Sequence, residues 1–184
     1  MQFRSLLADR RGSSLGELLT GVFILGIIGA LAVPRLDWMA YRVNGEVRQV
    51  AMQLSYAQRL AVSLQHNVQV TIDRANRRII VDEDANNDGI FSSNERRRVL
   101  QLEAGLNFER NSAPALPAPA PDNELTQIIF RRDGSASQSG AVFLNSIRGV
   151  AGGNNKDARA LVITRATGRA SSFSYLNGSW VARM

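Results

Sequence analysis

An acidic segment near the middle of the chain carries side-chain oxygens at alternating positions, a pattern that suits a metal ion. Residues 84–95 read DANNDGIFSSNE and fit the calcium-loop pattern D-x-[DN]-x-[DN]-G-x5-E. Calcium takes several oxygen ligands, and such loops need a glycine for the sharp turn and a distal glutamate that binds through both oxygens. The predicted ligands are Asp84, Asn86, Asp88, the backbone carbonyl of Ile90, Ser92 through a water molecule, and Glu95.

A second interpretation of this segment remains open. Both flanks resemble strands, whereas an EF-hand loop lies between helices. The segment can therefore be an acidic turn whose Asn and Asp side chains cap their own backbone. If calcium binds, its role is structural, because it orders a loop whose negative charges otherwise repel one another.

Another candidate site lies near the N-terminus, where a single acid precedes an apolar run. Residues 1–12 hold three arginines against one aspartate, and the apolar run over residues 18–33 follows Glu17. A basic flank stays in the cytoplasm, so the rest of the chain is expected to be exported.

Three interpretations of this segment compete. The first is a cleaved secretory signal peptide, for which residues 30–32 (ALA) offer a small-x-small cleavage site before Val33. The second is an uncleaved signal anchor. The third is a short leader that is cut between Gly12 and Ser13, on the cytoplasmic side of the apolar run.

Glu17 favours the third interpretation. An acidic residue costs roughly 2–3 kcal/mol at the centre of an apolar span, and neither a signal peptide nor a plain anchor gains from it. Cleavage after Gly12 would create an amine at Ser13, four residues from Glu17. In a bundle of such helices, the Glu17 carboxylate of one subunit can neutralise the Ser13 amine of its neighbour and set the register.

Arginines near the C-terminus are candidates for contacts with phosphate groups. The formal net charge of the chain is +6. A basic balance permits contact with DNA or anionic lipid, although a solvated basic surface is the commoner outcome. The candidate DNA contacts are Arg159, Arg165, Arg169 and Arg183.

The sequence contains no pattern typical of a catalytic site, and we expect a protein that is not an enzyme. It has no cysteine, which excludes a disulfide framework and a thiolate metal site. It also has no G-x-S-x-G motif and no phosphate-binding glycine loop. The single histidine, His66, falls at a predicted helix end, where we expect a capping or surface role.

The elements that must position these residues are a long helix and a series of strands. From Leu36 to Leu64, apolar residues recur at spacings of four and three, which predicts an amphipathic helix to about His66, with a bend at Pro34. Short strands joined by tight turns imply an antiparallel sheet, and the proline-rich residues 111–123 predict an extended surface loop. A period of two predicts strands at residues 68–72, 77–81, 97–102, 125–130, 141–144, 160–164, 171–176 and 179–183.

The N-terminal residues resemble the precursors of type IV pilins and type II secretion pseudopilins. The shared elements are a basic leader that ends in Gly12, a glutamate at Glu17 and an apolar helix with a proline. Ser13 replaces the usual phenylalanine, and Gly16 replaces a bulky apolar residue. The resemblance implies cleavage by a prepilin peptidase, N-methylation of Ser13 and docking through Glu17 during assembly.

The remainder resembles the GspH/FimT type of minor pseudopilin in the order of its elements. The segments that carry this resemblance are FRRDG at residues 130–134, LVI at 161–163 and TGR at 167–169. It implies an α+β, pilin-like fold, in which a long N-terminal helix, transmembrane and then amphipathic, packs on an antiparallel β-sheet head. The expected organisation is a leader at residues 1–12, a transmembrane helix at 13–36, an amphipathic helix at 37–66 and a β-rich head at 67–184.

The function that this resemblance implies is a structural one, in a type II secretion pseudopilus or a type IV pilus. The subunit is expected to cross the bacterial inner membrane once, with a cytoplasmic N-terminus and a periplasmic or extracellular head, and then to join the filament or its tip. Its expected partners are other pilin or pseudopilin subunits, prepilin peptidase and inner-membrane lipid.

Two alternatives accompany this expectation. Some FimT-like proteins hold DNA through a basic C-terminal region with a glycine–arginine–x–arginine element. Here the match stops at Gly168-Arg169, because Ala170 and Ser171 follow. The other alternative is a secreted calcium-binding domain that begins at Val33 after removal of a signal peptide.

Overall fold

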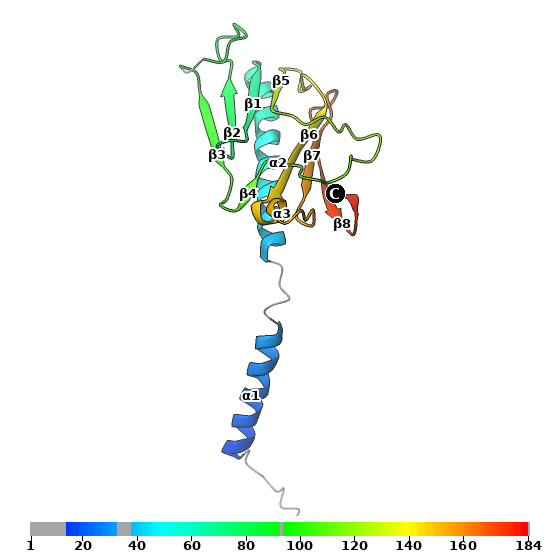
Figure 1. The fold of residues 1–184 in the computed structure, drawn as a ribbon. Coiled ribbons are helices and arrows are strands. Elements are labelled where there is room, and N and C mark those ends of the chain that lie inside the picture. Colours follow the sequence, from blue (N-terminus) through cyan, green and yellow to red (C-terminus); the bar gives the residue numbers. More distant parts are fainter. Residues whose placement is uncertain (1–13, 33–37, 93, 184) are drawn as a thin grey trace, which may run out of the picture. The chain divides into compact units, whose positions relative to one another are not determined.

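Two helices come first in the described part of the chain (Figure 1). The computed structural model describes residues 14–32, 38–92 and 94–183. Helix α1 spans Leu15–Ala32 and helix α2 spans Trp38–Leu64. The predicted bend at Pro34 lies outside the described residues. The chain divides into two units, Met1–Trp38 and Met39–Met184, and each is described by itself.

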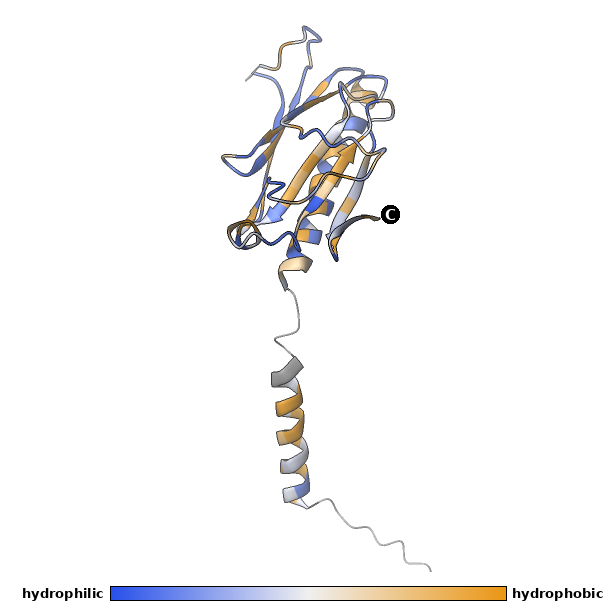
Figure 2. Cartoon of the chain, turned by 45° about the vertical axis from the view of Figure 1, so that its right-hand side comes forward, coloured by the Kyte–Doolittle hydropathy of each residue, from blue (hydrophilic) through white to orange (hydrophobic). Residues whose placement is uncertain are grey.

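Helix α1 is apolar on all sides apart from its first turn. The side chains of residues 15–29 are exposed, including Leu19 at 70% and Phe23 at 69%. Figure 2 shows the hydrophobic colour along most of the helix. The backbone N–H of Glu17 donates to Ser14 Oγ at 3.2 Å, which makes Ser14 the N-cap. Within residues 14–32, 38–92 and 94–183, no helix is both long and apolar enough to cross a membrane.

Helix α2 is amphipathic, as its sequence pattern predicts. It ends at Leu64, because Gln65 adopts a left-handed φ of 56°, so the helix stops two residues before the predicted end. Glu46 is buried with the apolar face although it is charged, and its Oε1 accepts the backbone N–H of Glu103 at 3.0 Å. The apolar residues of the buried face are Val43, Val47, Val50, Leu54, Ala57 and Ala61.

The strands form two antiparallel sheets rather than the single sheet expected. The first has the order β3-β2-β1-β5 and the second β4-β6-β7-β8-β9. Alternation of apolar residues predicts where strands lie but not which strands pair, so the division was not readable from the sequence. The strands are β1 Val68–Asp73, β2 Arg78–Glu83, β3 Arg97–Gln101, β4 Leu106–Asn107, β5 Gln127–Phe130, β6 Gly140–Ser146, β7 Arg159–Ile163, β8 Ala170–Leu176 and β9 Ser179–Arg183.

Two short elements escaped the sequence pattern. Strand β4 has only two residues and pairs with the end of β6. Helix α3, Ile147–Ala151, is a single turn that follows β6. Ser146 caps it by accepting the backbone N–H of Gly149 at 2.9 Å.

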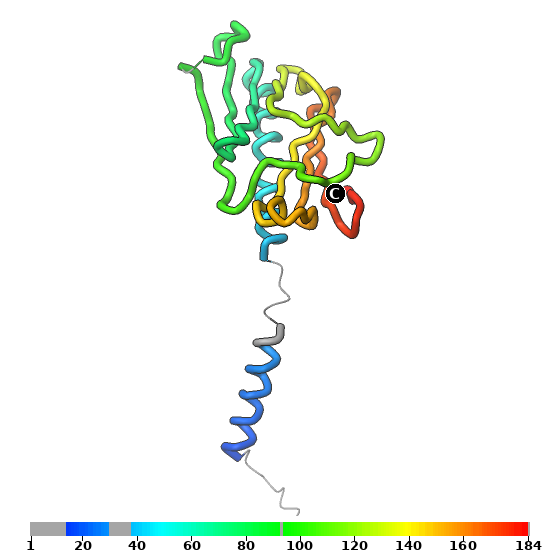
Figure 3. The backbone as a smooth tube through the Cα atoms, viewed as in Figure 1, coloured from blue at the N-terminus to red at the C-terminus, as the bar shows by residue number. Residues whose placement is uncertain are grey.

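Strands β6 and β7 lie between two apolar clusters and are buried along their full lengths. On one face, Leu144 and Leu161 pack with the apolar side of α2. On the other face, Phe143 packs with Ala113 and Leu116 from the loop over residues 111–123. Figure 3 shows this loop, in green and yellow-green, running across the second sheet between β4 and β5. The loop therefore covers the core in addition to lying at the surface.

Candidate functional site

The processing site expected at Gly12 and Ser13 lies outside the described residues. Glu17 is described and exposed, in the first turn of α1. A carboxylate there is favoured by the positive end of the helix dipole. Ser14 and Glu17 also have the spacing of a capping box, a local role that sequence reasoning overlooked.

The acidic segment forms the loop between β2 and β3, and its carboxylates accept hydrogen bonds from the loop backbone. Asp84 Oδ2 accepts the N–H of Gly89 at 3.1 Å. Glu95 joins the two ends of the loop, because Oε1 accepts the N–H of Ala85 at 2.8 Å and Oε2 accepts that of Ser92 at 2.9 Å. Both acids therefore face into the loop.

Asp88 and Asn86 stabilise the turn at the exposed end of this loop. Asp88 Oδ1 accepts the N–H of Ile90 at 2.7 Å, and Asn86 Oδ1 accepts that of Asp88 at 3.0 Å. These contacts match the predicted backbone-capping interpretation. In the described part of the chain, no three His, Asp or Glu side chains are already gathered around one point. These contacts do not test calcium binding, which stays a prediction.

Three consecutive acids at the end of β2 are buried, a feature that sequence reasoning missed. Asp82 is 4%, Glu83 5% and Asp84 1% exposed. Asp82 Oδ1 lies 2.6 Å from Nε of Arg97, and this hydrogen bond raises the pKa of the arginine. The signal available in the sequence was an Asp-Glu-Asp run directly after an apolar strand.

His66, for which a capping or surface role was expected, is also buried, at 6% exposure. Its Nε2 lies 3.6 Å from Oε2 of Glu83, and Nε of Arg96 lies 3.9 Å from Oε1 of the same glutamate. The short turn between α2 and β1 carries the imidazole into the protein beside β2. Asp82 and Glu83 therefore both face a basic side chain.

The candidate DNA contacts are divided between two places. Arg159 is 3% exposed, and its Nε donates to Oδ1 of Asn44 in α2 at 2.8 Å. Arg159 and Arg183 line a cavity of about 170 Å³ with other residues of α2 and β8. Arg165 and Arg169 are exposed in the turn between β7 and β8.

The motifs at residues 130–134 and 167–169 both contact helix α2. Nε2 of Gln58 donates to the carbonyl of Gly134 at 2.8 Å and to that of Thr167 at 2.6 Å. A Cβ placed on Gly168 would collide with the carbonyl oxygen of Gly134. The Asp-Gly turn and the Thr-Gly-Arg turn therefore pack too closely for any side chain at position 168.

Solved structures of a bacterial secretion protein are similar to this chain. One, described as the minor pseudopilin EpsH from the type 2 secretion system of Vibrio cholerae, has a TM-score of 0.47 and 13% identity, covering 77% of this chain and 96% of the other. A second structure of EpsH has a TM-score of 0.38 and 14% identity, covering 77% of this chain and 92% of the other. No curated protein matches the chain.

The family comparison covers most of the β-rich unit and part of α2. Residues 46–168 match the family model described as type II transport protein GspH. This range holds Gln58, both carbonyls that it binds and the whole acidic loop. It also exceeds half of the 184 residues. The chain therefore belongs to the GspH family.

Proposed function

We propose that this chain is a structural subunit of a type II secretion pseudopilus, made as a precursor and cleaved between Gly12 and Ser13. The observation that carries the proposal is the exposed apolar surface of α1 in a chain of the GspH family. A helix that is apolar all round needs lipid or other helices against it. The predicted span over residues 13–36, of which α1 is the described part, then lies in the inner membrane before assembly and among neighbouring helices afterwards.

Glu17 directs docking in this proposal. It is the only charged residue of α1, and its carboxylate is exposed. Cleavage after Gly12 places a new amine at Ser13, near the same end of the helix. Inside a bundle of apolar helices, the amine of one subunit and the Glu17 carboxylate of the next neutralise each other, which fixes their register. The head then contacts other minor subunits outside the cytoplasm, in a structural and not a catalytic role.

Replacement of Glu17 by Gln tests the docking role. Glutamine keeps the size of the side chain but removes the charge, so we expect membrane-bound subunits with folded heads that do not enter the filament. The measurement is the amount of the chain in sheared pseudopili, with the membrane fraction probed by limited proteolysis. A matched control is Thr20→Val, because the Thr20 hydroxyl donates to the carbonyl of Gly16 within the same helix, at 2.7 Å. Normal incorporation of Glu17→Gln would contradict the docking role.

N-terminal sequencing of the mature protein separates this proposal from a secreted domain. The proposal expects Ser13 as the first residue, carrying an N-methyl group. A mature chain that begins at Val33 would support removal of a signal peptide and would refute an anchored subunit. A chain that retains residues 1–12 would refute processing by prepilin peptidase.

DNA capture is a second candidate function, and one observation favours it. The backbone N–H of Ala136 donates to the carbonyl of Arg165 at 2.8 Å, so the turn that carries Arg131 and Arg132 adjoins the turn that carries Arg165 and Arg169. Clustered cations on adjoining turns suit phosphate contacts. Binding to duplex DNA that falls with salt and is lost in the double variant Arg165→Ala, Arg169→Ala would support it. Binding unchanged in that variant would refute it.

A further inference from the structure

We propose that the loop between β2 and β3, residues 84–95, binds one calcium ion. The site is separate from the docking role of Glu17. The observation that carries it is Asp84, whose side chain is 1% exposed and whose Oδ1 has no hydrogen-bond partner among the described residues. The other oxygen of this carboxylate accepts the N–H of Gly89, so the group faces into the loop. A buried carboxylate with an unpartnered oxygen needs a cation.

The neighbouring arginines do not supply that cation. Arg97 is paired with Asp82 at 2.6 Å, and Arg96 lies 3.9 Å from Glu83. The guanidinium of Arg98 lies over the ring of Tyr56, 5.1 Å from its centroid. The three basic residues that follow the loop are thus directed to β2 and α2.

The loop carboxylates are therefore left without a basic partner. In the described part of the chain, no ion pair is formed by Asp84, Asp88 or Glu95. Their mutual repulsion is strongest where water is excluded, at Asp84. A divalent cation removes this repulsion for all three groups at once.

The chemistry and spacing of the loop select calcium. Its donors are all oxygens: carboxylates at positions 1, 5 and 12, an amide oxygen at position 3 and the backbone carbonyl of Ile90 at position 7. The glycine of the pattern, Gly89, has a φ of +80°, which the sharp turn requires. Asp84 and Glu95 already face into the loop from its two ends. Magnesium demands a smaller, near-octahedral arrangement and suits such a flexible set of ligands less well.

Backbone capping alone does not account for this arrangement. Capping explains the contacts of Glu95, Asp88 and Asp84 Oδ2, which all accept N–H groups of the loop. It leaves Asp84 Oδ1 buried without a donor among the residues that the structure describes. Calcium bound at that oxygen would satisfy it and hold the start of the loop to its end.

Two measurements test the site: calorimetric titration with calcium and thermal unfolding. Both use the full chain in detergent, after a chelator has removed divalent ions. We expect one calcium ion per chain, and a melting temperature that rises by roughly 5–10 °C when free calcium reaches about one hundred times its dissociation constant. Magnesium at the same concentration should give a clearly smaller rise. No binding at about 10 mM calcium would overturn the proposal, because even weak extracellular sites bind at roughly 10⁻⁴–10⁻³ M.

Variants connect the response to the loop. Asp88→Ala and Glu95→Gln should each weaken calcium binding by about tenfold or more, because each removes one of the three charges. The matched control is Asp133→Ala, since Asp133 is also an exposed turn aspartate whose Oδ1 accepts the N–H two residues on, at 2.9 Å. Calcium binding that is unchanged in Asp88→Ala and Glu95→Gln would place the ion elsewhere and overturn the proposal.

Asp84→Asn gives a separate test in the presence of chelator. Asparagine can still accept the N–H of Gly89 but carries no charge, so the variant should melt at the same temperature as the wild type or higher, and should not respond to calcium. A clearly lower melting temperature in chelator would show that the Asp84 charge is already stabilised within the protein, which would contradict the proposal.

Discussion

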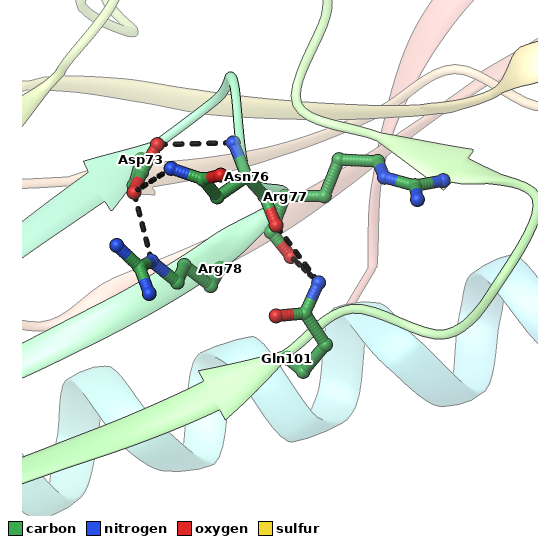
Figure 4. A network of polar contacts seen from close by, with 5 residues as sticks. All are labelled: Asp73, Asn76, Arg77, Arg78 and Gln101. Atoms are coloured by element: carbon green, nitrogen blue, oxygen red, sulfur yellow. Dashed lines mark hydrogen bonds and ion pairs between the residues drawn. The ribbon is translucent and has the colours of Figure 1, made fainter.

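At the scale of single residues, the turn between β1 and β2 shows how one carboxylate organises a hairpin (Figure 4). Asp73 accepts hydrogen bonds from the backbone N–H of Asn76 at 3.0 Å, from its side-chain amide at 2.8 Å and from Nε of Arg78 at 2.8 Å. Gln101 of β3 donates to the carbonyls of Asn76 and Arg77. The turn is thereby tied both to its own strands and to the next one.

These contacts predict an acid-sensitive turn. The pKa of Asp73 is lowered below its ordinary value, chiefly by the hydrogen bond from the Asn76 side chain. The hydrogen bonds from the backbone N–H of Asn76 and from Arg78 lower it further. Because the pKa is lower in the folded state, the ionised group stabilises the protein above the ordinary aspartate pKa. That contribution is lost as the pH falls through the folded pKa. Carboxyl NMR titration should show the lowered pKa in the wild type and a higher one in Asn76→Ala.

A control for this titration is Asn94→Ala, which alters an exposed asparagine in the β2–β3 loop. It should leave the pKa of Asp73 unchanged. An ordinary or raised pKa of Asp73 in the wild type would show that the hydrogen bonds of the turn do not persist in solution.

At the scale of elements, α2 joins the two turns whose sequences carried the family resemblance. Gln58 binds a carbonyl of each turn, and Gly168 approaches the carbonyl of Gly134. The glycines in these motifs are therefore explained by close packing and by positive φ angles, +82° at Gly134 and +62° at Gly168.

A pair of glycine substitutions separates these two causes. Gly168→Ala meets both a positive φ and the carbonyl of Gly134, whereas Gly178→Ala, in the turn before β9, has φ +85° and nothing within 4 Å. We expect Gly178→Ala to lower the free energy of unfolding by about 1 kcal/mol, and Gly168→Ala to lower it by clearly more. Denaturant unfolding of the two variants measures the difference. Equal effects would show that the two turns separate without cost.

At the scale of the whole β-rich unit, the second sheet is covered on both faces, by α2 and by the loop over residues 111–123. Trp180 of β9 adds to this cover, because its Nε1 donates to the carbonyl of Pro114 at 2.8 Å. Edge strand β9 and the loop thus hold each other over β6 and β7. The free energy of unfolding of this unit should therefore depend on the loop over residues 111–123 as strongly as on a core strand or helix.

Leu116→Ala tests this dependence. Leu116 is 6% exposed, so its truncation should lower the free energy of unfolding by about 2–3 kcal/mol, as in a core. Leu64→Ala is the matched control, because Leu64 is 48% exposed and should change stability by less than about 0.5 kcal/mol. Similar small effects of both substitutions in denaturant unfolding would show that the loop only rests on the surface.

The sequence by itself determined the local features of this protein. The stripe from Val43 to Ala61 predicted the buried face of α2, because residues three and four apart share a helix face. The period of two placed most strands within one or two residues of their observed ends. The precursor-like N-terminus and the order of elements indicated the family, to which the chain belongs.

Only the tertiary structure decided which distant residues meet. Strand pairing depends on contacts across the chain, so the division into two sheets was not readable from local alternation. Arg159 was a candidate DNA contact and His66 was expected in a capping or surface role, yet both are buried. Arg159 is hydrogen-bonded to Asn44, and His66 lies beside the Glu83 carboxylate, so polar groups from other elements accompany both side chains. The same long-range packing directs Arg96, Arg97 and Arg98 away from the acidic loop and leaves Asp84 buried without a basic partner in the described part of the chain.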